Sequence, residues 1–381
     1  MNAAGGVARR ALPVLLLIAS VTASALIGEW LVRLVLDPVD YLAVDPVYDP
    51  VLRVRLEPNA GGHDAWGFRN RSLPDSADVV TIGDSQTYGI SAPAHASWPA
   101  QLADLTGRRV YNMALGTYGP VQYYELLRTR ALRLRPRFIV VGLYYGNDLY
   151  NSYQTVYGLR HWEHLRREGL PVVHDSTGVV TRREVFLAPM RDWLARHSVL
   201  YRLTTFTRIG GLARNLEFTE GGWAPGVVDF QHPVHGARTG FTPAMRLFAL
   251  DLREATVREG LRISLDRLDR MAQECRAAGV HLLVALIPTK ERVHAPWLVQ
   301  RTDLSEYSTF KLLLEQEYAV DRQIREHLAR HSVPYIDLEP ALRKAAAATA
   351  IYPGNADGHP NAEGYAVIAR AVARALVDFA P

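Results

Sequence analysis

The sequence has a single cysteine, Cys275, among its 381 residues. One cysteine permits no internal disulfide, and the helical pattern around it favours a buried apolar side chain over a nucleophile. Excess charge of one sign is also lacking, since 43 Lys and Arg residues oppose 39 Asp and Glu residues for a net charge of +4. The arginines are spread along the chain instead of forming a basic face. This distribution argues against a nucleic-acid-binding protein.

Only one long hydrophobic run is present, and it lies at the start. With 48% hydrophobic and 22% charged residues, the composition excludes a disordered, collagenous or multi-span membrane protein. Residues 11–28 carry no charge. At ~1.5 Å per residue this run would form a helix about 27 Å long, close to the ~30 Å hydrocarbon core of a bilayer. We expect residues 1–36 to be a transmembrane anchor or signal sequence that contacts lipid through residues 11–36.

The residues that flank this run predict its orientation. Arg9 and Arg10 precede it, and the positive-inside rule then puts the rest of the chain on the extracytoplasmic side, periplasmic or extracellular. A secreted protein cleaved near Ala25 is the alternative, because small residues there resemble a signal-peptidase site. We favour the uncleaved anchor because the helical pattern continues through Glu29 and Arg33, one turn apart.

The remainder alternates short apolar runs with helical patterns, which predicts a parallel sheet covered by helices on both faces. Residues 37–63, rich in Pro and Asp, are expected to form an extended lead-in, and residues 64–381 the main domain. The expected strands are 79–82, 109–111, 138–143, 281–287 and 333–338. The expected helices between them include 121–134, 263–278 and 362–379. The predicted fold class is α/β, a three-layer α/β/α sandwich with a five-stranded parallel sheet.

Residues 149–259 interrupt this alternation and are too long for a bare loop, so we expect a mostly helical or irregular insertion. Its tryptophans, Trp162, Trp193 and Trp223, are expected to form a small core, with a sugar-stacking surface as the alternative. The sequence His232-Pro-Val-His235 is interpreted as a surface loop and not as a metal-binding pair. We predict no metal site and no cofactor.

Polar residues follow each of the first three strands, where ligands bind in open parallel sheets. Ser85 follows the first strand and could be a nucleophile if His359 accepts its proton and Asp357 orients the imidazole. The tetrahedral oxyanion needs fixed donors. The backbone N–H groups of Ser85 and Gly116 and the amide of Asn147 can supply them. Gly119 competes with Gly116 for this role.

These segments resemble the four blocks of the SGNH (GDSL-type) hydrolases. They read GDSQT, NMALGTYG, GND and DGH, at residues 83–87, 112–119, 146–148 and 357–359. The resemblance implies a flavodoxin-like fold, with Ser85, Gly116, Asn147 and His359 in the naming positions and Asp357 completing the triad. The phrases WGFRN and IPTKERV are similar to membrane-anchored members associated with envelope polysaccharides, whose relatives include acetyltransferases of exopolysaccharides such as alginate.

The sequence departs from the usual family pattern at two blocks. Gly146 directly precedes Asn147, and Asp357 stands two residues before His359 where the family usually has three. Asp84 and Asp148 are expected to support their turns. Two further residues are candidate substrate ligands. Lys290 could bind an anionic group, with a solvated lysine as the alternative, and Tyr118 could line the acyl pocket.

The predicted function is therefore an exported serine-dependent esterase that forms an acyl-serine intermediate. The substrate expected from the resemblance is an acyl ester of an envelope or extracellular carbohydrate. One alternative is an O-acyltransferase (acetyltransferase) that modifies an exported polysaccharide, because water and a sugar hydroxyl can accept the same acyl group. A second alternative is a non-catalytic polysaccharide-binding protein on the same scaffold.

Overall fold

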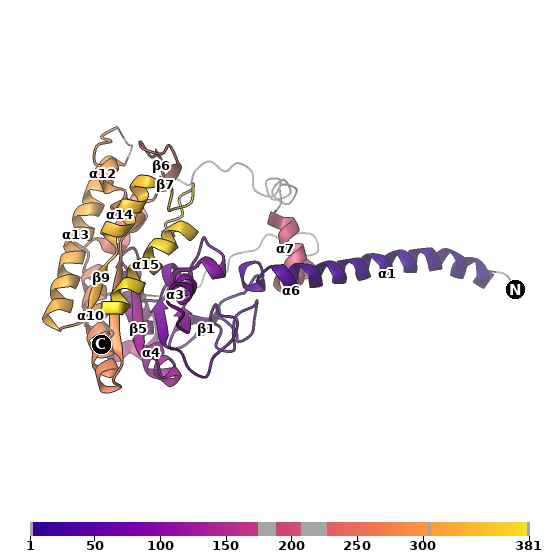
Figure 1. Ribbon diagram of the computed structural model, residues 1–381, viewed down its shortest axis with the longest axis horizontal. Helices are drawn as coiled ribbons and strands as arrows, with labels where there is room; N and C mark the ends of the chain where they lie inside the picture. The colour runs from indigo at the N-terminus through magenta and orange to yellow at the C-terminus, as the bar shows by residue number, and fades with distance from the viewer. Residues whose placement is uncertain (1–2, 174–187, 207–226, 304–305, 379–381) are drawn as a thin grey trace. The chain divides into compact units, whose positions relative to one another are not determined.

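The computed structural model describes residues 3–173, 188–206, 227–303 and 306–378 (Figure 1). The strands are β1 Val47–Asp49, β2 Arg53–Arg55, β3 Val79–Gly83, β4 Val110–Ala114, β5 Phe138–Tyr144, β6 Val228–Gln231, β7 Arg238–Phe241, β8 His281–Ile287 and β9 Tyr335–Asp337. The helices are α1 Ala3–Val35, α2 Ser85–Tyr88, α3 Trp98–Thr106, α4 Pro120–Thr129, α5 Asp148–Gly158, α6 Ala188–His197, α7 Val199–Phe206, α9 Pro243–Leu250, α10 Ala255–Ala277, α11 Lys290–Val293, α12 Ala295–Leu298, α13 Tyr307–Arg330, α14 Glu339–Ala348 and α15 Ala362–Asp378. Short 3₁₀ turns are η1 Pro38–Asp40, η2 Ala94–Ala96, η3 Ala131–Leu134 and η4 Arg160–Leu165.

The chain divides into two compact units. One comprises residues 1–45, 60–62 and 180–222, and it contains α1, α6 and α7. The other comprises residues 46–59, 63–179 and 223–381 and contains all strands of the described ranges. The middle of the predicted insertion thus belongs to the same unit as the N-terminal helix.

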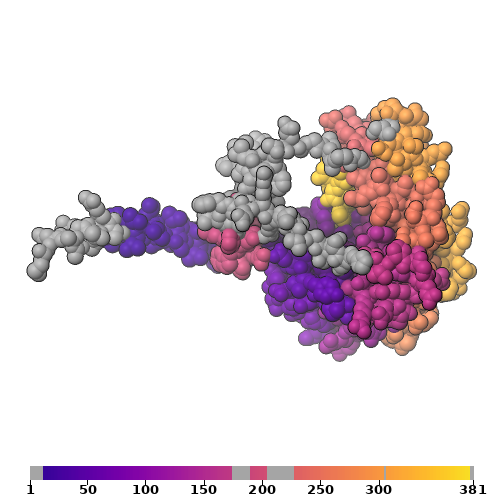
Figure 2. Space-filling model, turned by 180° about the vertical axis from the view of Figure 1, so that it is seen from behind, coloured from indigo at the N-terminus to yellow at the C-terminus, as the bar shows by residue number. Residues whose placement is uncertain are grey.

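In the first unit, α1 is long and apolar enough to cross a membrane. Residues Leu12–Val35 have a mean hydropathy of 1.9 and none of that stretch is buried. The space-filling view shows the exposed side chains of the indigo part of this helix (Figure 2). A signal sequence near the N-terminus meets the same criterion. The helix continues past Ala25 as predicted, and Arg33 Nε donates a 2.6 Å hydrogen bond to Glu29.

Near the end of α1, the side chain of Glu29 caps the N-terminus of α7 in the same unit. The Glu29 carboxylate accepts hydrogen bonds from Ser198 Oγ at 2.8 Å and from the N–H groups of Val199 and Leu200 at 2.9 and 3.0 Å. The first N–H groups of α7 have no partner within their own helix, so the carboxylate satisfies them. This contact gives α6 and α7 a fixed attachment to α1.

The second unit contains the predicted sheet. Its five strands run parallel in the order β4-β3-β5-β8-β9, which confirms the fold class. This is the flavodoxin-like order, in which the chain direction across the sheet reverses between β3 and β5. Polar residues after β3 and β5 therefore flank the crevice where such sheets bind ligands.

Helices cover both faces of this sheet, which explains why its strands are continuous apolar runs. One face packs on α3, α14 and α15, where Trp98, Leu342 and Tyr365 join the strand residues Val140 and Leu283 in one core. On the other face, α4, α5 and α10 pack together. Figure 2 shows the magenta α5–η4 segment beside the salmon residues of α10.

Two parts of the predicted insertion depart from expectation. Its first helix, α5, packs against α4 and α10 and so belongs to the sandwich itself. The hairpin of β6 and β7 is antiparallel, with Val228 paired to Phe241. The described residues of the insertion are otherwise helical or irregular, as predicted. The hairpin itself was not predicted, because four-residue strands are too short for alternation to stand out in the sequence.

The tryptophans and histidines of the insertion have mixed outcomes. Trp162 is buried against Val121 and Ile263, as a core residue would be. Trp193 is 58% exposed, which contradicts its prediction, and Trp223 lies outside the described residues. His232 is buried and stacks on His235 at 4.0 Å, whereas Pro233 and Val234 lie in an exposed turn, as the surface-loop interpretation predicted. Burial lowers the pKa of His232 to about 4.

Candidate active site

Ser85 is held at the first turn of a short helix that follows β3. The Asp84 carboxylate accepts the Gln86 N–H at 2.8 Å and so caps α2, as predicted. Gly83 is required by close packing, because a Cβ there would lie 2.1 Å from Thr87 Oγ1. Ser85 is 7% exposed. The strand-to-helix turn thus presents its hydroxyl at the carboxyl edge of the sheet.

Ser85 and His359 meet across 274 residues of sequence. His359 Nε2 lies 2.8 Å from Ser85 Oγ, and His359 Nδ1 lies 2.5 Å from Asp357 Oδ1. Asp357 Oδ1 also accepts the His359 backbone N–H at 3.0 Å, so the two-residue spacing still closes the pair. Ser91 Oγ donates to the other Asp357 oxygen. The structure therefore connects Ser85, His359 and Asp357 in one hydrogen-bonded chain.

The Asp357 carboxylate is kept ionised. Burial alone would raise its pKa, but hydrogen bonds from His359 and Ser91 outweigh burial and hold the pKa well below the usual range. An ionised acceptor at Nδ1 fixes the imidazole tautomer whose Nε2 lone pair faces the hydroxyl.

Asn147 lies at the start of α5, after β5. It is partly exposed, and its side chain hydrogen-bonds Asp84, the neighbour of Ser85. Its Oδ1 atom is buried without a partner. This arrangement leaves the Asn147 amide next to the Ser85 turn, where the sequence predicted a donor.

Gly116 is better placed than Gly119 to supply a backbone donor. A Cβ on Gly116 would lie 3.7 Å from Ser85 Cβ, so the two backbones are adjacent. Among the described residues neither the Ser85 nor the Gly116 N–H has a hydrogen-bond acceptor. The Gly119 N–H instead donates to Gln122 Oε1 at 3.1 Å. Two N–H groups beside Ser85 therefore remain available to a ligand.

Comparison with known proteins gives a family match for the C-terminal part of the chain. Residues 247–379 match the model described as the SGNH hydrolase-like domain of the acetyltransferase AlgX. This part of the chain is therefore similar to the SGNH hydrolase-like domain of that family. The matched segment includes Asp357 and His359, whereas Ser85 and Asn147 precede it.

Solved structures were compared as well. An acetylxylan esterase from Geobacillus stearothermophilus is 10% identical, with a TM-score of 0.38 over 79% of this chain and 94% of its own. A GDSL-like lipase from Bacteroides thetaiotaomicron is 12% identical, with a TM-score of 0.36 over 79% of this chain and 88% of its own. A search of curated protein sequences finds no significant match.

Lys290 supports the loop that carries Asp357 and His359. The side chain is fully buried, and Nζ donates to the carbonyl oxygens of Asn355 and Asp357, both at 2.9 Å. Burial lowers the pKa of Lys290 to about 8. Its predicted binding of an anionic substrate is therefore wrong. The sequence put it at a strand end, but its side chain turns inward to bind the loop.

The hairpin of the insertion holds the same loop. The Gly240 N–H donates to Asn355 O at 3.0 Å, and Thr239 Oγ1 donates to Pro353 O at 2.8 Å. Sequence reasoning missed both residues, because they donate to backbone carbonyl groups of the loop, and no motif marks such contacts. Together with Lys290 they fix the segment that carries Asp357 and His359.

Arg246 of α9 is a third residue that the sequence did not reveal. A Cβ on Gly358, between Asp357 and His359, would lie 2.5 Å from Arg246 Nη2. The guanidinium also lies over the Tyr144 ring at 5.7 Å. Within the described residues Arg246 makes no side-chain hydrogen bond or ion pair, and both its Nε and the Tyr144 hydroxyl are buried without a partner. An unused cationic donor therefore lies beside the catalytic loop.

Tyr118 does not line an acyl pocket. It is 1% exposed, and its hydroxyl donates to Val54 O of the β1–β2 hairpin at 2.8 Å. The prediction of a substrate contact is wrong, because the side chain anchors the hairpin to the loop that follows β4.

Two buried carboxylates lie behind Ser85. Asp148 accepts the Tyr144 N–H at 2.8 Å and the Tyr123 hydroxyl at 3.0 Å, which confirms its supporting role. Burial, and then the negative charge of Asp84, raise the pKa of Asp148. Burial also raises the pKa of Asp84. Burial and the neighbouring negative charge thus both disfavour ionisation of Asp148.

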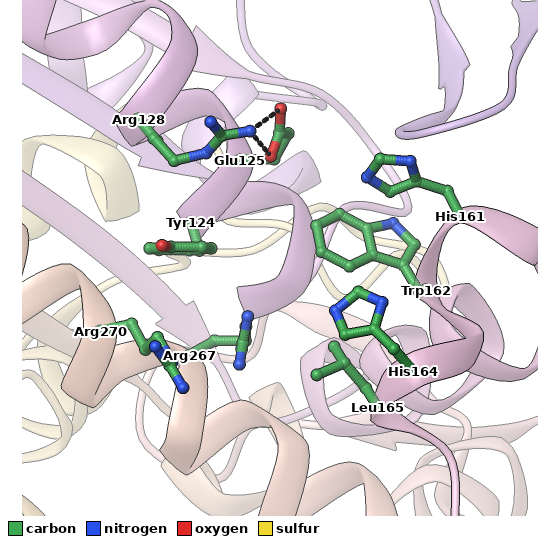
Figure 3. A pocket seen from close by; sticks show the side chains of 9 residues that line it. All are labelled: Tyr124, Glu125, Arg128, His161, Trp162, His164, Leu165, Arg267 and Arg270. Atoms are coloured by element: carbon green, nitrogen blue, oxygen red, sulfur yellow. Dashed lines mark hydrogen bonds and ion pairs between the residues drawn. The ribbon is translucent and has the colours of Figure 1, made fainter.

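A cavity of about 340 Å³ lies apart from these residues, between α4, η4 and α10 (Figure 3). Its buried wall is formed by Trp162, Glu125 and Arg267, and its rim by exposed side chains that include Arg128 and Arg270. Arg128 is paired with Glu125 at 3.0 Å. None of the predicted catalytic residues lines this cavity.

Proposed function

We propose that this protein transfers acyl groups through Ser85, with water as the first acceptor and hence as an ester hydrolase. The observation that carries the proposal is the hydrogen-bonded chain from Ser85 Oγ through His359 to Asp357, with distances of 2.8 and 2.5 Å. A serine hydroxyl becomes a useful nucleophile when a neutral imidazole can accept its proton. The match of residues 247–379 to an SGNH hydrolase-like domain supports that chemistry.

The reaction begins when Ser85 Oγ attacks the ester carbonyl and its proton moves to His359 Nε2. The imidazolium that forms is stabilised by the ionised Asp357 at Nδ1. The oxyanion of the tetrahedral intermediate accepts hydrogen bonds from the unused N–H groups of Ser85 and Gly116 and from the Asn147 amide. Each such donor is worth roughly 3–4 kcal/mol in the transition state.

Collapse of the intermediate expels the alcohol, which takes the proton from His359 Nε2 and leaves an acyl-Ser85 ester. Water then attacks that ester with His359 as base and releases the free acid. The unpartnered guanidinium of Arg246 can bind an oxygen of the substrate beside the loop. This contact would orient the ester without changing the steps.

Transfer to a sugar hydroxyl is the second candidate, and the match to an acetyltransferase model favours it. The steps are the same until deacylation, where a carbohydrate hydroxyl replaces water. A small acyl ester on an envelope or extracellular carbohydrate fits both candidates. We further propose that α1 anchors the protein in a membrane, with the catalytic unit on the extracytoplasmic side.

The test uses the full chain in detergent and an activated acetate ester. We expect wild type to release acetate, and Ser85→Ala to lose at least about 10³-fold in kcat. Ser72→Ala, an exposed serine outside the site, is the matched control and should match wild type. Equal and complete inactivity of wild type and Ser85→Ala would refute an enzymatic role with this ester and favour the polysaccharide-binding alternative.

The acceptor is identified by a second experiment with the same protein. A donor ester is supplied with and without an oligosaccharide, and free acid and acylated sugar are measured separately. A hydrolase gives only free acid in both mixtures. Acylated sugar that forms with wild type but not with Ser85→Ala would identify a transferase.

A further inference from the structure

Three potential metal ligands lie together on the two long helices that lead into β8 and β9. Asp269 is on α10, His327 is in the last turn of α13, and His331 is the C-cap residue of α13, four residues later. One ligand atom of each lies within 4.8 Å of the other two. The cluster precedes the amino ends of those strands, whereas Ser85 follows the carboxyl end of β3. It is therefore separate from the candidate active site.

The ligand atoms already have nearly the spacing that a metal ion requires. His327 Nε2 lies 2.9 and 3.0 Å from the two Asp269 oxygens, and His331 Nδ1 lies 3.1 Å from Asp269 Oδ1. Tetrahedral Zn²⁺ with bonds of ~2.0–2.1 Å places its ligand atoms about 3.3 Å apart. The two imidazole rings stack at 4.2 Å and 15°, so both edges face the same carboxylate. The carboxylate–imidazole separations would lengthen by only a few tenths of an ångström to admit an ion, and the two imidazole nitrogens already lie within 4.8 Å of each other.

We propose that Asp269, His327 and His331 bind a divalent transition-metal ion, with Zn²⁺ the expected occupant. Two imidazole nitrogens and one carboxylate oxygen match the ligand preference of Zn²⁺, and a water completes the tetrahedron. Each neutral imidazole carries its proton on the nitrogen that does not face the ion. The side chains of Asp269, His327 and His331 are 18%, 15% and 44% exposed. An ion can therefore enter from solvent.

The bound ion would connect α10 to α13 and so stabilise their contact. These helices touch, and each ends a few residues before a strand of the sheet. A bound ion replaces hydrogen bonds that span them with shorter bonds to one centre. The cluster escapes sequence motifs because Asp269 and His327 are 58 residues apart. The expectation of no metal site rested on sequence spacing alone.

The test measures Zn²⁺ binding to the full chain in detergent, purified without a polyhistidine tag and freed of metal by a chelator that is then removed. Isothermal titration should give one Zn²⁺ per chain for wild type. We expect Asp269→Asn and His331→Ala to weaken binding at least about tenfold. His95→Ala is the matched control, since His95 is exposed on another part of the fold, and should bind within about twofold of wild type.

Thermal unfolding gives a second measurement that does not depend on enzymatic activity. Added Zn²⁺ should raise the melting temperature of wild type and His95→Ala but not of His331→Ala. Because His331 is the most exposed ligand, its loss should leave the metal-free fold intact, which circular dichroism checks. Wild type without stoichiometric binding, or Asp269→Asn and His331→Ala with unchanged affinity, would overturn the proposal.

Discussion

Replacement of Lys290 by methionine separates positioning of the catalytic loop from stability of the fold. The substitution keeps the length of a fully buried side chain but removes the ammonium that binds Asn355 O and Asp357 O. Asn355 O keeps the Gly240 N–H as a donor at 3.0 Å. Only the Asp357 carbonyl is left without one.

The stability terms nearly cancel. Leaving one buried carbonyl unpaired costs about 1–3 kcal/mol. In the opposite direction, burial lowers the pKa of Lys290 from 10.5 to about 8, which corresponds to a charge-burial cost of about 3 kcal/mol that methionine does not pay. We therefore expect the free energy of unfolding of Lys290→Met to stay within about 2 kcal/mol of wild type.

The effect on catalysis should be larger. Loss of the tether lets the Asp357–His359 segment move relative to Ser85, and a displacement of ~1 Å can cost ~10²-fold in rate. We expect kcat for a small acetate ester to fall at least about tenfold in Lys290→Met, with KM changed less. Urea unfolding and steady-state kinetics measure the two quantities.

The matched control is Lys311→Met, which changes an exposed lysine of α13 and should alter neither quantity. A stable Lys290→Met with kcat within twofold of wild type would refute the positioning argument. It would show that Gly240, Thr239 and Ser91 hold the loop without the ammonium.

Three further changes test other parts of the account. Asp357→Asn should lower kcat by about 10⁴-fold, because the amide favours the wrong imidazole tautomer, and ester kinetics measure it. Asn147→Ala should lower kcat by about 10²–10³-fold with little change in KM, since an oxyanion donor acts mainly in the transition state. Burial raises the pKa of Glu317 from 4.5 to about 7, so the folded chain binds the extra proton, and stability should fall by about 3 kcal/mol as pH rises from 4.5 to 7. Urea titrations should show that Glu317→Gln removes this fall.

The sheet could be predicted from the sequence because its strands are buried on both faces. Runs such as residues 138–143 and 281–287 are continuously apolar, and the structure extends the first only to Tyr144. The β6–β7 hairpin was missed because each strand has only four residues, and β7 contains the polar residue Thr239 and a glycine in place of an apolar run. The contact of Glu29 with α7 was equally hidden, since it joins residues about 170 apart.

In the candidate site, too, some residues could be predicted from the sequence and others could not. Ser85 and Asn147 could be placed together because parallel strands bring their carboxyl ends to one edge of the sheet, and His359 was indicated by the resemblance of residues 357–359 to the last family block. The surroundings of the loop could not be, because Lys290 and Arg246 approach it through tertiary packing. Lys290 illustrates the error best: its position after β8 was predicted correctly, and the direction of its side chain was not.

The central claim is that Ser85 is the nucleophile, and covalent labelling tests it most directly. Wild-type protein is treated with a serine-reactive fluorophosphonate, digested and analysed by mass spectrometry. The account predicts one label on the peptide that contains Ser85, lost in Ser85→Ala and strongly slowed in Asp357→Asn. Wild type that stays unlabelled, or Ser85→Ala labelled as fast as wild type, would contradict it.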